Sequence, residues 1–262
     1  FHRLGTYASS LQGIATADFS KYGRMFWEFC RIESKWSFQQ GTVVETRSFG
    51  GREGVVLWEG GHGELAKNPQ ARIQGLEAIG KRGLVISQMR LLPVTLFEGD
   101  LFDNNVAAVI PEKQELLPAL WAFCSSSDFT VSVRAIDQKS SVTNATFAKV
   151  PFDLAHWQKV AAEKYPHGLP KPYSSDPTQW LFNGHPKGSD QPLHVAMARL
   201  LGYQWPRQTG SSFPDCPALK PDGLETLADD DGIVCLSAAK GEAPAAERLR
   251  GGGCKPWENS TS

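Results

Sequence analysis

The sequence predicts an α+β fold in which small, mixed β-sheets pack with helices, and an irregular Pro-rich strap lies across the surface. Hydrophobic residues make up 41% of the 262-residue chain and charged residues 21%, a composition typical of a globular protein with a real core. Short apolar runs bounded by turn residues alternate with segments of helical periodicity, which indicates both kinds of element. Several prolines and glycines in residues 165–193 exclude a regular element there and indicate the strap.

Helix and strand signals alternate in the first third of the chain. Ser20 is the expected N-cap of a helix over residues 20–29, and three of its aromatic residues are expected in the core: Phe26, Trp27 and Phe29. β signals begin at Trp36 and end in a short buried strand over Gly54–Trp58. A short helix is expected over Asn68–Ile79, because Gly80 is a common helix terminator.

The stretch from Gly83 to Asp153 carries the clearest order in the chain. A helix is expected after Pro111 with one apolar face, then a Ser-rich break, a second helix, a strand ending at Pro151, and a further amphipathic helix over Leu154–Lys164. Before them come three expected strands: Leu84–Met89, Val94–Phe97 and Val106–Ile110.

Composition changes divide the chain into four parts. Residues 1–35 are expected to be a linker and helix, residues 36–160 an α/β domain, residues 161–205 the strap with a helix over Val195–Tyr203, and residues 206–262 a partly disordered extension. A short strand is expected at residues 233–239 within that extension. The first residue is Phe rather than Met, which indicates a fragment of a longer polypeptide.

Charge and cysteine usage narrow the class of protein. A net charge of -1 neither favours nor excludes a local cationic groove for nucleic acid. Five widely spaced cysteines without a C-x-x-C motif indicate buried, reduced thiols rather than disulfides or zinc ligands. With no secretory signal and no run of about 18 apolar residues, a cytoplasmic protein without a membrane partner is expected.

Catalytic, cofactor and metal motifs are missing from the sequence. There is no G-x-S-x-G elbow, no H-E-x-x-H and no P-loop. Asp100 and Asp103 resemble a carboxylate pair, but their setting among Asn and Gly favours turn residues. Three histidines invite a metal hypothesis, yet their spacing favours ordinary loop residues: His167, His185 and His194.

Polar side chains suited to nucleic acid gather at the ends of the expected strands. Arg and Lys hold phosphates, and Arg, Asn and Gln read base edges. Arg52 lies on a glycine turn and is a candidate phosphate contact, although the turn favours a solvated arginine side chain. The candidate DNA-binding residues are Arg52, Ser87, Arg90, Asn104, Asn105, Lys139, Ser140, Thr143 and Asn144.

Several strings, in order, resemble one family. G-I-A-T-A-D followed by F-W-E resembles the G-(L/I)-x-T-G-D and R-F-x-R-x-W-E segment that follows the catalytic domain of large N6-adenine DNA methyltransferases of type IIG restriction-modification, BREX and DISARM systems. Ala17 stands where that segment has glycine. The strings G-L-V-I-S-Q-M-R-L-L-P-V-T-L-F, F-D-N-N, L-W-A-F-C-S-S and V-T-N-A-T-F-A-K-V-P-F-D resemble the target-recognition part of these enzymes.

The resemblance implies transfer of a methyl group from S-adenosylmethionine to N6 of a flipped adenine in double-stranded DNA. The family's N-P-P-Y motif and cofactor loop do not occur here, so the resemblance places S-adenosylmethionine and catalysis in an upstream methyltransferase domain. The implied partners are double-stranded DNA, that domain, and other subunits of the defence system. The implied fold of residues 36–160 is like that of a target-recognition domain.

Two other functions are compatible with the sequence. One is a stand-alone DNA-specificity module that acts through a partner protein and has no catalytic activity. The other is a carbohydrate-binding or hydrolytic protein, which rests on the eight tryptophans and the Pro-rich strap.

Overall fold

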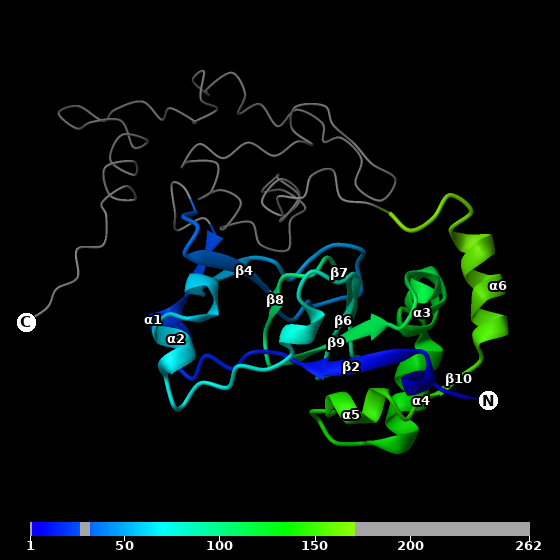
Figure 1. The fold of residues 1–262 in the computed structure, drawn as a ribbon. Helices are drawn as coiled ribbons and strands as arrows, with labels where there is room; N and C mark the ends of the chain where they lie inside the picture. The colour runs from blue at the N-terminus through cyan, green and yellow to red at the C-terminus, as the bar shows by residue number, and fades with distance from the viewer. Residues whose placement is uncertain (1, 27–31, 171–262) are drawn as a thin grey trace, which may run out of the picture. The chain divides into compact units, whose positions relative to one another are not determined.

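The computed structural model describes residues 2–26 and 32–170, and their fold is mixed α+β with small sheets packed with helices, as predicted (Figure 1). One compact unit consists of Phe1–Arg24 with Ser34–Pro170. Residues 2–24, within the segment expected to be a linker and helix, belong to this unit. The expected elements beyond Pro170, namely most of the strap, the helix over Val195–Tyr203, the strand at residues 233–239 and the C-terminal extension, lie outside the described residues.

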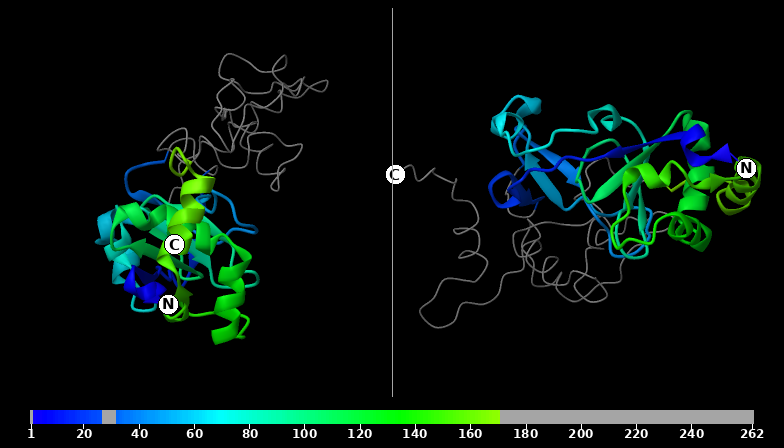
Figure 2. Two further views of the ribbon diagram at one scale, coloured as in Figure 1. Left: turned by 90° about the vertical axis from the view of Figure 1, so that its right-hand side faces the viewer. Right: turned by 90° about the horizontal axis from the view of Figure 1, so that it is seen from below.

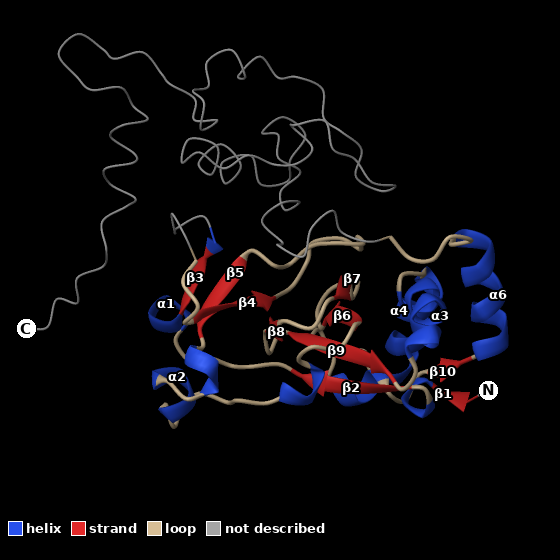
Figure 3. Ribbon diagram, turned by 45° about the horizontal axis from the view of Figure 1, so that its top comes forward, coloured by secondary structure: helices blue, strands red, loops and turns tan. Residues whose placement is uncertain are grey.

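The central sheet has four antiparallel strands in the order β2-β9-β6-β7 (Figure 3). Three of them lie where they were predicted: β6 (Gly83–Ser87), β7 (Val94–Phe97) and β9 (Val106–Pro111). The fourth, β2 (Ala8–Gln12), pairs with β9 from Ala8 opposite Pro111 to Gln12 opposite Ala107. It was not predicted, because the sequence A-S-S-L-Q has only a weak apolar alternation.

Both faces of the central sheet are buried. Leu84 and Ile86 of β6 join the large core that includes the helices, whereas Val85, between them, packs with Phe97 and Phe102 on the opposite face. A strand with two buried faces needs apolar residues at every position. This requirement explains why the three predicted strands appear in the sequence as continuous apolar runs.

Four α-helices follow β9 within the described residues: α3 (Leu117–Cys124), α4 (Ser127–Ile136), α5 (Asn144–Phe147) and α6 (Leu154–Lys164). The bounds of α6 are those predicted, and α6 lies beside α3 (Figure 1). Asp153 caps α6 by accepting a hydrogen bond from the backbone N–H of His156 at 3.1 Å. The single apolar face expected for α3 is wrong: all its residues except Pro118 are buried.

The start of the chain pairs with the segment that precedes α6. β1 (His2–Arg3) runs antiparallel to β10 (Pro151–Phe152) (Figure 3), and Figure 2 shows the N-terminus on the same side as the yellow-green helix α6. The strand β10 begins at Pro151, the residue at which a strand was expected to end. Tyr7 packs edge-on against Phe152, with ring centroids 5.7 Å apart. The first residues are thus fixed to the helical part of the unit.

A second four-stranded sheet has the order β3-β5-β4-β8, with α1 (Phe19–Tyr22) and α2 (Glu64–Lys67) beside it (Figure 3). The strands are β3 (Gly23–Met25), β5 (Gly54–Leu57), β4 (Trp36–Gln40) and β8 (Leu101–Phe102), and β4 pairs with β8 in parallel. Tyr22, Val56 and Leu65 form the core between this sheet and the two short helices. The β signals from Trp36 and the strand at Gly54 are confirmed.

Two predicted helices in this region are wrong. The helix over residues 20–29 ends at Tyr22, because Gly23 is extended and begins β3, and its N-cap is Asp18 rather than Ser20. The helix over Asn68–Ile79 is only a 3-10 turn over Leu76–Ala78, which follows Gly75 in the left-handed conformation. Phe26 is buried as expected, whereas Trp27 and Phe29 lie outside the described residues.

Helices α3 and α4 bear on two expectations from the sequence, the lack of a membrane-spanning helix and the buried, reduced cysteines. Among the described residues no single helix is both long and apolar enough to cross a membrane, and the pair Gln114–Cys124 with Ser127–Ile136, which passes on length and composition together, bends by 82° at its break. Cys124 is an unpaired, buried thiol, as predicted, and burial raises its pKa. The other cysteines lie outside the described residues.

Ala17 has a left-handed backbone, with φ 63°. An L-residue pays a steric cost in this conformation that glycine avoids, so Ala17→Gly is expected to raise the free energy of unfolding by about 0.5–1 kcal/mol. Ala135→Gly in α4 is the control and should lower it by about 0.5–1 kcal/mol, since glycine weakens a helix interior. Urea denaturation measures both, and a loss of stability in Ala17→Gly would contradict the expectation.

Candidate functional site

The polar residues expected to bind DNA meet, with one exception, at one end of the central sheet. This polar sheet end consists of Gln12 at the end of β2, residues 87–90 at and after the end of β6, residues 103–105 before β9, and residues 139–144 between α4 and α5. The strand register brings these parts together, because Gln12 pairs with Ala107 and Ser87 pairs with Val106. The exception is Arg52.

Hydrogen bonds join the separate segments of the polar sheet end. The Gln88 N–H donates to the Asn105 carbonyl at 3.1 Å, and the Gln88 carbonyl accepts from the Val142 N–H at 2.8 Å. The Gln88 side chain donates to Gln12 Oε1 at 3.0 Å, and Gln12 Nε2 donates to the Asn104 carbonyl. Asn144 Nδ2 donates to the Ser10 carbonyl at 3.0 Å. Main-chain bonds therefore hold these loops in fixed register.

The candidates differ in exposure. Asn104 and Asn144 are half-buried and take part in the bonds between segments. Ser87 is buried and its hydroxyl accepts from the Val43 N–H at 3.2 Å, so its side chain makes a contact inside the fold and is not part of the exposed surface. The exposed candidates are Arg90, Asn105, Lys139, Ser140 and Thr143.

Cationic groups surround the exposed candidates. Arg134 of α4 donates to the carbonyl of Arg90 at 2.7 Å and to the carbonyl of Lys139, so its guanidinium lies between the two cationic residues. Carboxylates in the same loops are engaged by backbone N–H groups: Asp137 Oδ1 accepts from the Lys139 N–H at 3.0 Å, and Asp103 Oδ1 from the Asn105 N–H at 2.7 Å. The cationic side chains thus project from loops whose acids act as turn caps.

Arg52 is not solvated, contrary to the sequence expectation. Its side chain is 5% exposed, and it forms an ion pair with Asp100. Burial raises the pKa of Asp100, and the Arg52 guanidinium opposes that rise. A buried, paired arginine cannot hold a phosphate without leaving Asp100 uncompensated, so in this fold Arg52 serves the ion pair and is not part of the exposed surface.

The two aspartates suspected as a carboxylate pair have separate roles. Asp103 is a turn residue, as predicted, because its Oδ1 accepts from both the backbone and the side-chain N–H groups of Asn105, at 2.7 and 2.6 Å. Asp100 is the ion-pair partner of Arg52, so the turn-only reading is wrong for it.

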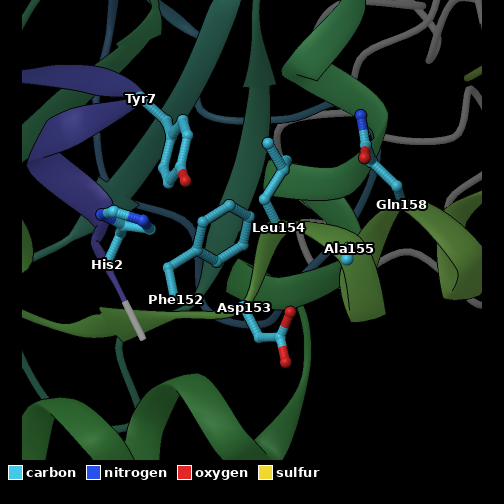
Figure 4. A pocket seen from close by; sticks show the side chains of 7 residues that line it. All are labelled: His2, Tyr7, Phe152, Asp153, Leu154, Ala155 and Gln158. Atoms are coloured by element: carbon cyan, nitrogen blue, oxygen red, sulfur yellow. The ribbon is translucent and has the colours of Figure 1, made fainter.

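Two open concavities lie at the β1–β10 side of the unit. One, of about 560 Å³, is lined by the rings of His2, Tyr7 and Phe152, and its carboxylate, Asp153, caps α6 and points away from those rings (Figure 4). The other, of about 990 Å³, combines Val131 and Ile136 of α4 with the cationic side chains of Arg3 and Lys149. His2 lines both concavities, together with Asp153 in the first and Ser132 in the second.

No set of three or more His, Cys, Asp or Glu residues within residues 2–26 and 32–170 is grouped to hold a metal ion. His167 is described, whereas His185 and His194 are not.

No protein-family model matches this sequence, and no match was found among curated proteins.

The candidate set from the sequence lacks Gln12 and Gln88 of the polar sheet end, and it lacks Arg134 of α4, which is hydrogen-bonded to that end. The Gln12–Gln88 amide pair joins β2 to the end of β6, and Arg134 joins α4 to two loops. Thr130 and Arg134 are four residues apart on α4, a spacing common to any helix face. The sequence therefore does not reveal that both side chains bond to the turn at residues 90–91.

Proposed function

We propose that this chain recognises double-stranded DNA through the polar sheet end, as the target-recognition part of a cytoplasmic N6-adenine DNA methyltransferase of a restriction-modification or phage-defence system. One observation carries the DNA assignment: candidates chosen from separate strand ends converge on one surface, where Arg90, Lys139 and Arg134 supply positive charge. The ordered sequence strings support the methyltransferase assignment.

The exposed side chains fit the two kinds of contact that DNA requires. Arg90 and Lys139 suit phosphates, whereas Asn105 suits a base edge because an amide both donates and accepts. The fixed register of the loops is an advantage for such a surface, since side chains on a rigid frame lose less entropy on binding.

Methyl transfer is assigned to a domain outside these residues. Because the sequence contains neither N-P-P-Y nor the cofactor loop of the resembling family, the proposal places the S-adenosylmethionine site in an upstream domain. Other defence-system subunits are further proposed partners. The alternative is a separate specificity module, which uses the same surface but acts through a partner protein. The open concavity that contains the exposed residues Val131 and Ile136 favours this alternative.

Binding of a fluorescein-labelled duplex, followed by anisotropy over a series of salt concentrations, tests the proposal. The affinity should fall as salt rises, and Arg90→Ala and Lys139→Ala should each reduce the salt slope by about 1. Asn105→Ala should weaken binding to the preferred sequence by about 1–3 kcal/mol. The wild-type chain alone should methylate nothing.

Lys159→Ala on α6 is the matched control, because it removes an exposed lysine from a helix packed on α3 rather than from the polar sheet end. Its affinity and salt slope should equal those of the wild type. Unchanged binding in all three test variants would place the DNA contact elsewhere, and absence of salt-dependent binding by the wild type would overturn the DNA assignment.

A further inference from the structure

The turn that follows β6, residues 89–92, combines backbone strain with exposed apolar side chains. Arg90 and Leu92 both have left-handed backbones, with φ 58° and 55°, although neither is glycine. The turn closes through a hydrogen bond from the Leu92 N–H to the Met89 carbonyl at 3.1 Å. Leu92 is buried, whereas Leu91 is 79% exposed and Met89 48% exposed. A single exposed leucine is ordinary, but two strained residues that flank it are not.

Contacts with α4 and the neighbouring loop hold the turn in this shape. The Leu91 carbonyl accepts from Thr130 Oγ1 at 3.1 Å, and the Arg90 carbonyl accepts from Arg134 at 2.7 Å. Met89 forms an isolated antiparallel bridge with Ser141. Two side-chain hydrogen bonds thus stabilise the strained backbone of this turn, and the turn holds Leu91 at its tip.

The surroundings of Leu91 identify the chemistry of what it meets. Arg90 lies on the same turn, and Arg134 of α4 donates to the backbone carbonyls of Arg90 and Lys139, so three cationic residues lie near the small apolar tip formed by Leu91 and Met89. Proteins that deform DNA insert leucine, methionine or similar side chains between base pairs, while arginine and lysine hold the adjacent phosphates. An apolar protein partner would instead need a wider apolar patch.

We propose that Leu91 is a wedge that enters the base stack of duplex DNA and partly unstacks one step. This inference rests on the proposed DNA-recognition function and adds to it a deformation of the duplex. Arg90 holds the phosphates beside the opened step, and the strained turn keeps Leu91 extended without a cost at the moment of binding.

The test uses the full chain and two fluorescein-labelled duplexes of one sequence, one fully matched and one with a central mismatch. Because a mismatched step is easier to unstack, the wild type should bind the mismatched duplex about tenfold more tightly. Leu91→Ala should abolish this preference, so that the variant binds the two duplexes with equal affinity. Since Leu91 is exposed, the variant should keep the wild-type circular dichroism and thermal midpoint.

Val131→Ala is the control, because Val131 is also an exposed apolar residue but lines the concavity that contains Arg3 and Lys149. It should keep the tenfold preference. A wild type without preference, or a Leu91→Ala variant that retains it, would overturn the wedge and leave DNA recognition standing. A wild type that binds neither duplex at low salt would overturn the proposed function and the wedge together.

Discussion

Arg52→Met is expected to lower the free energy of unfolding by about 3–5 kcal/mol, because removing one partner of a buried ion pair leaves the other charge uncompensated. Arg52 and Asp100 connect the turn before β5 to the turn before β8. The double variant Arg52→Met/Asp100→Leu should regain most of the loss, because it buries no charge. Chemical denaturation of the two variants and the wild type measures both effects.

The more exposed ion pair between Arg82 and Glu98, at 3.0 Å, provides the control. Arg82→Met should cost only about 0–1 kcal/mol. An equal loss in the free energy of unfolding in the Arg52 and Arg82 variants would show that burial does not increase the cost of breaking the Arg52–Asp100 pair.

The effect of Arg52→Met should also depend on pH. Without the guanidinium, burial and the nearby Glu98 charge both raise the pKa of Asp100 unopposed, so its pKa in the folded variant lies further above the unfolded value of 3.8. The folded variant then binds a proton that the unfolded chain has released, so its stability rises relative to the wild type as the pH falls from neutral toward 3.8. A deficit that stays constant over this range would contradict the assignment.

Gly13→Ala is expected to lower the free energy of unfolding by about 3 kcal/mol, the upper end of the usual cost of overpacking. A Cβ at Gly13 would overlap the carbonyl oxygens of Phe102 and Asp103. The backbone cannot easily yield there, because the Ile14 N–H donates to the Phe102 carbonyl at 2.8 Å and the Asn104 N–H to the Ile14 carbonyl at 3.1 Å. The displaced residues 103–105 should also weaken DNA binding.

Gly54→Ala is the matched control for this substitution. The nearest atom to an added Cβ there is the Gln39 carbonyl oxygen at 3.6 Å, an ordinary contact. Its stability should lie within about 0.5 kcal/mol of the wild type. Equal losses in the two alanine variants would indicate that the loss comes from replacing a glycine as such, and thermal unfolding with a duplex-binding assay distinguishes the cases.

The sequence predicts best those elements whose burial is complete. The apolar runs of β6, β7 and β9 and the periodicity of α6 fix their places, because a buried face leaves little choice of residue. The strand β2 escapes prediction because Ser10 is stabilised by a distant contact: its hydroxyl donates to the Asn144 carbonyl at 2.8 Å. Local patterns carry no information about such a partner.

The candidate site shows the same division. Polar residues at strand ends were recognised from their type and position, and the antiparallel register then determined that they meet. The burial of Arg52 could not be predicted, since the Asp100 that pairs with it lies on a different strand connection. The glycines around Arg52 indicate a turn, and a turn alone does not tell whether its side chains face solvent.

The main-chain bonds that join the segments of the polar sheet end have an evolutionary consequence. Because backbone groups of Gln88, Asn105 and Val142 hold the loops together, exchange of an exposed side chain leaves these bonds intact. Lys139 and Ser140 can therefore change one at a time at little cost to folding, whereas a change of Asn105 also removes its side-chain bond to Asp103. Such a surface can acquire a new sequence preference by single substitutions, whereas the Gln12–Gln88 amide pair has to change as a unit.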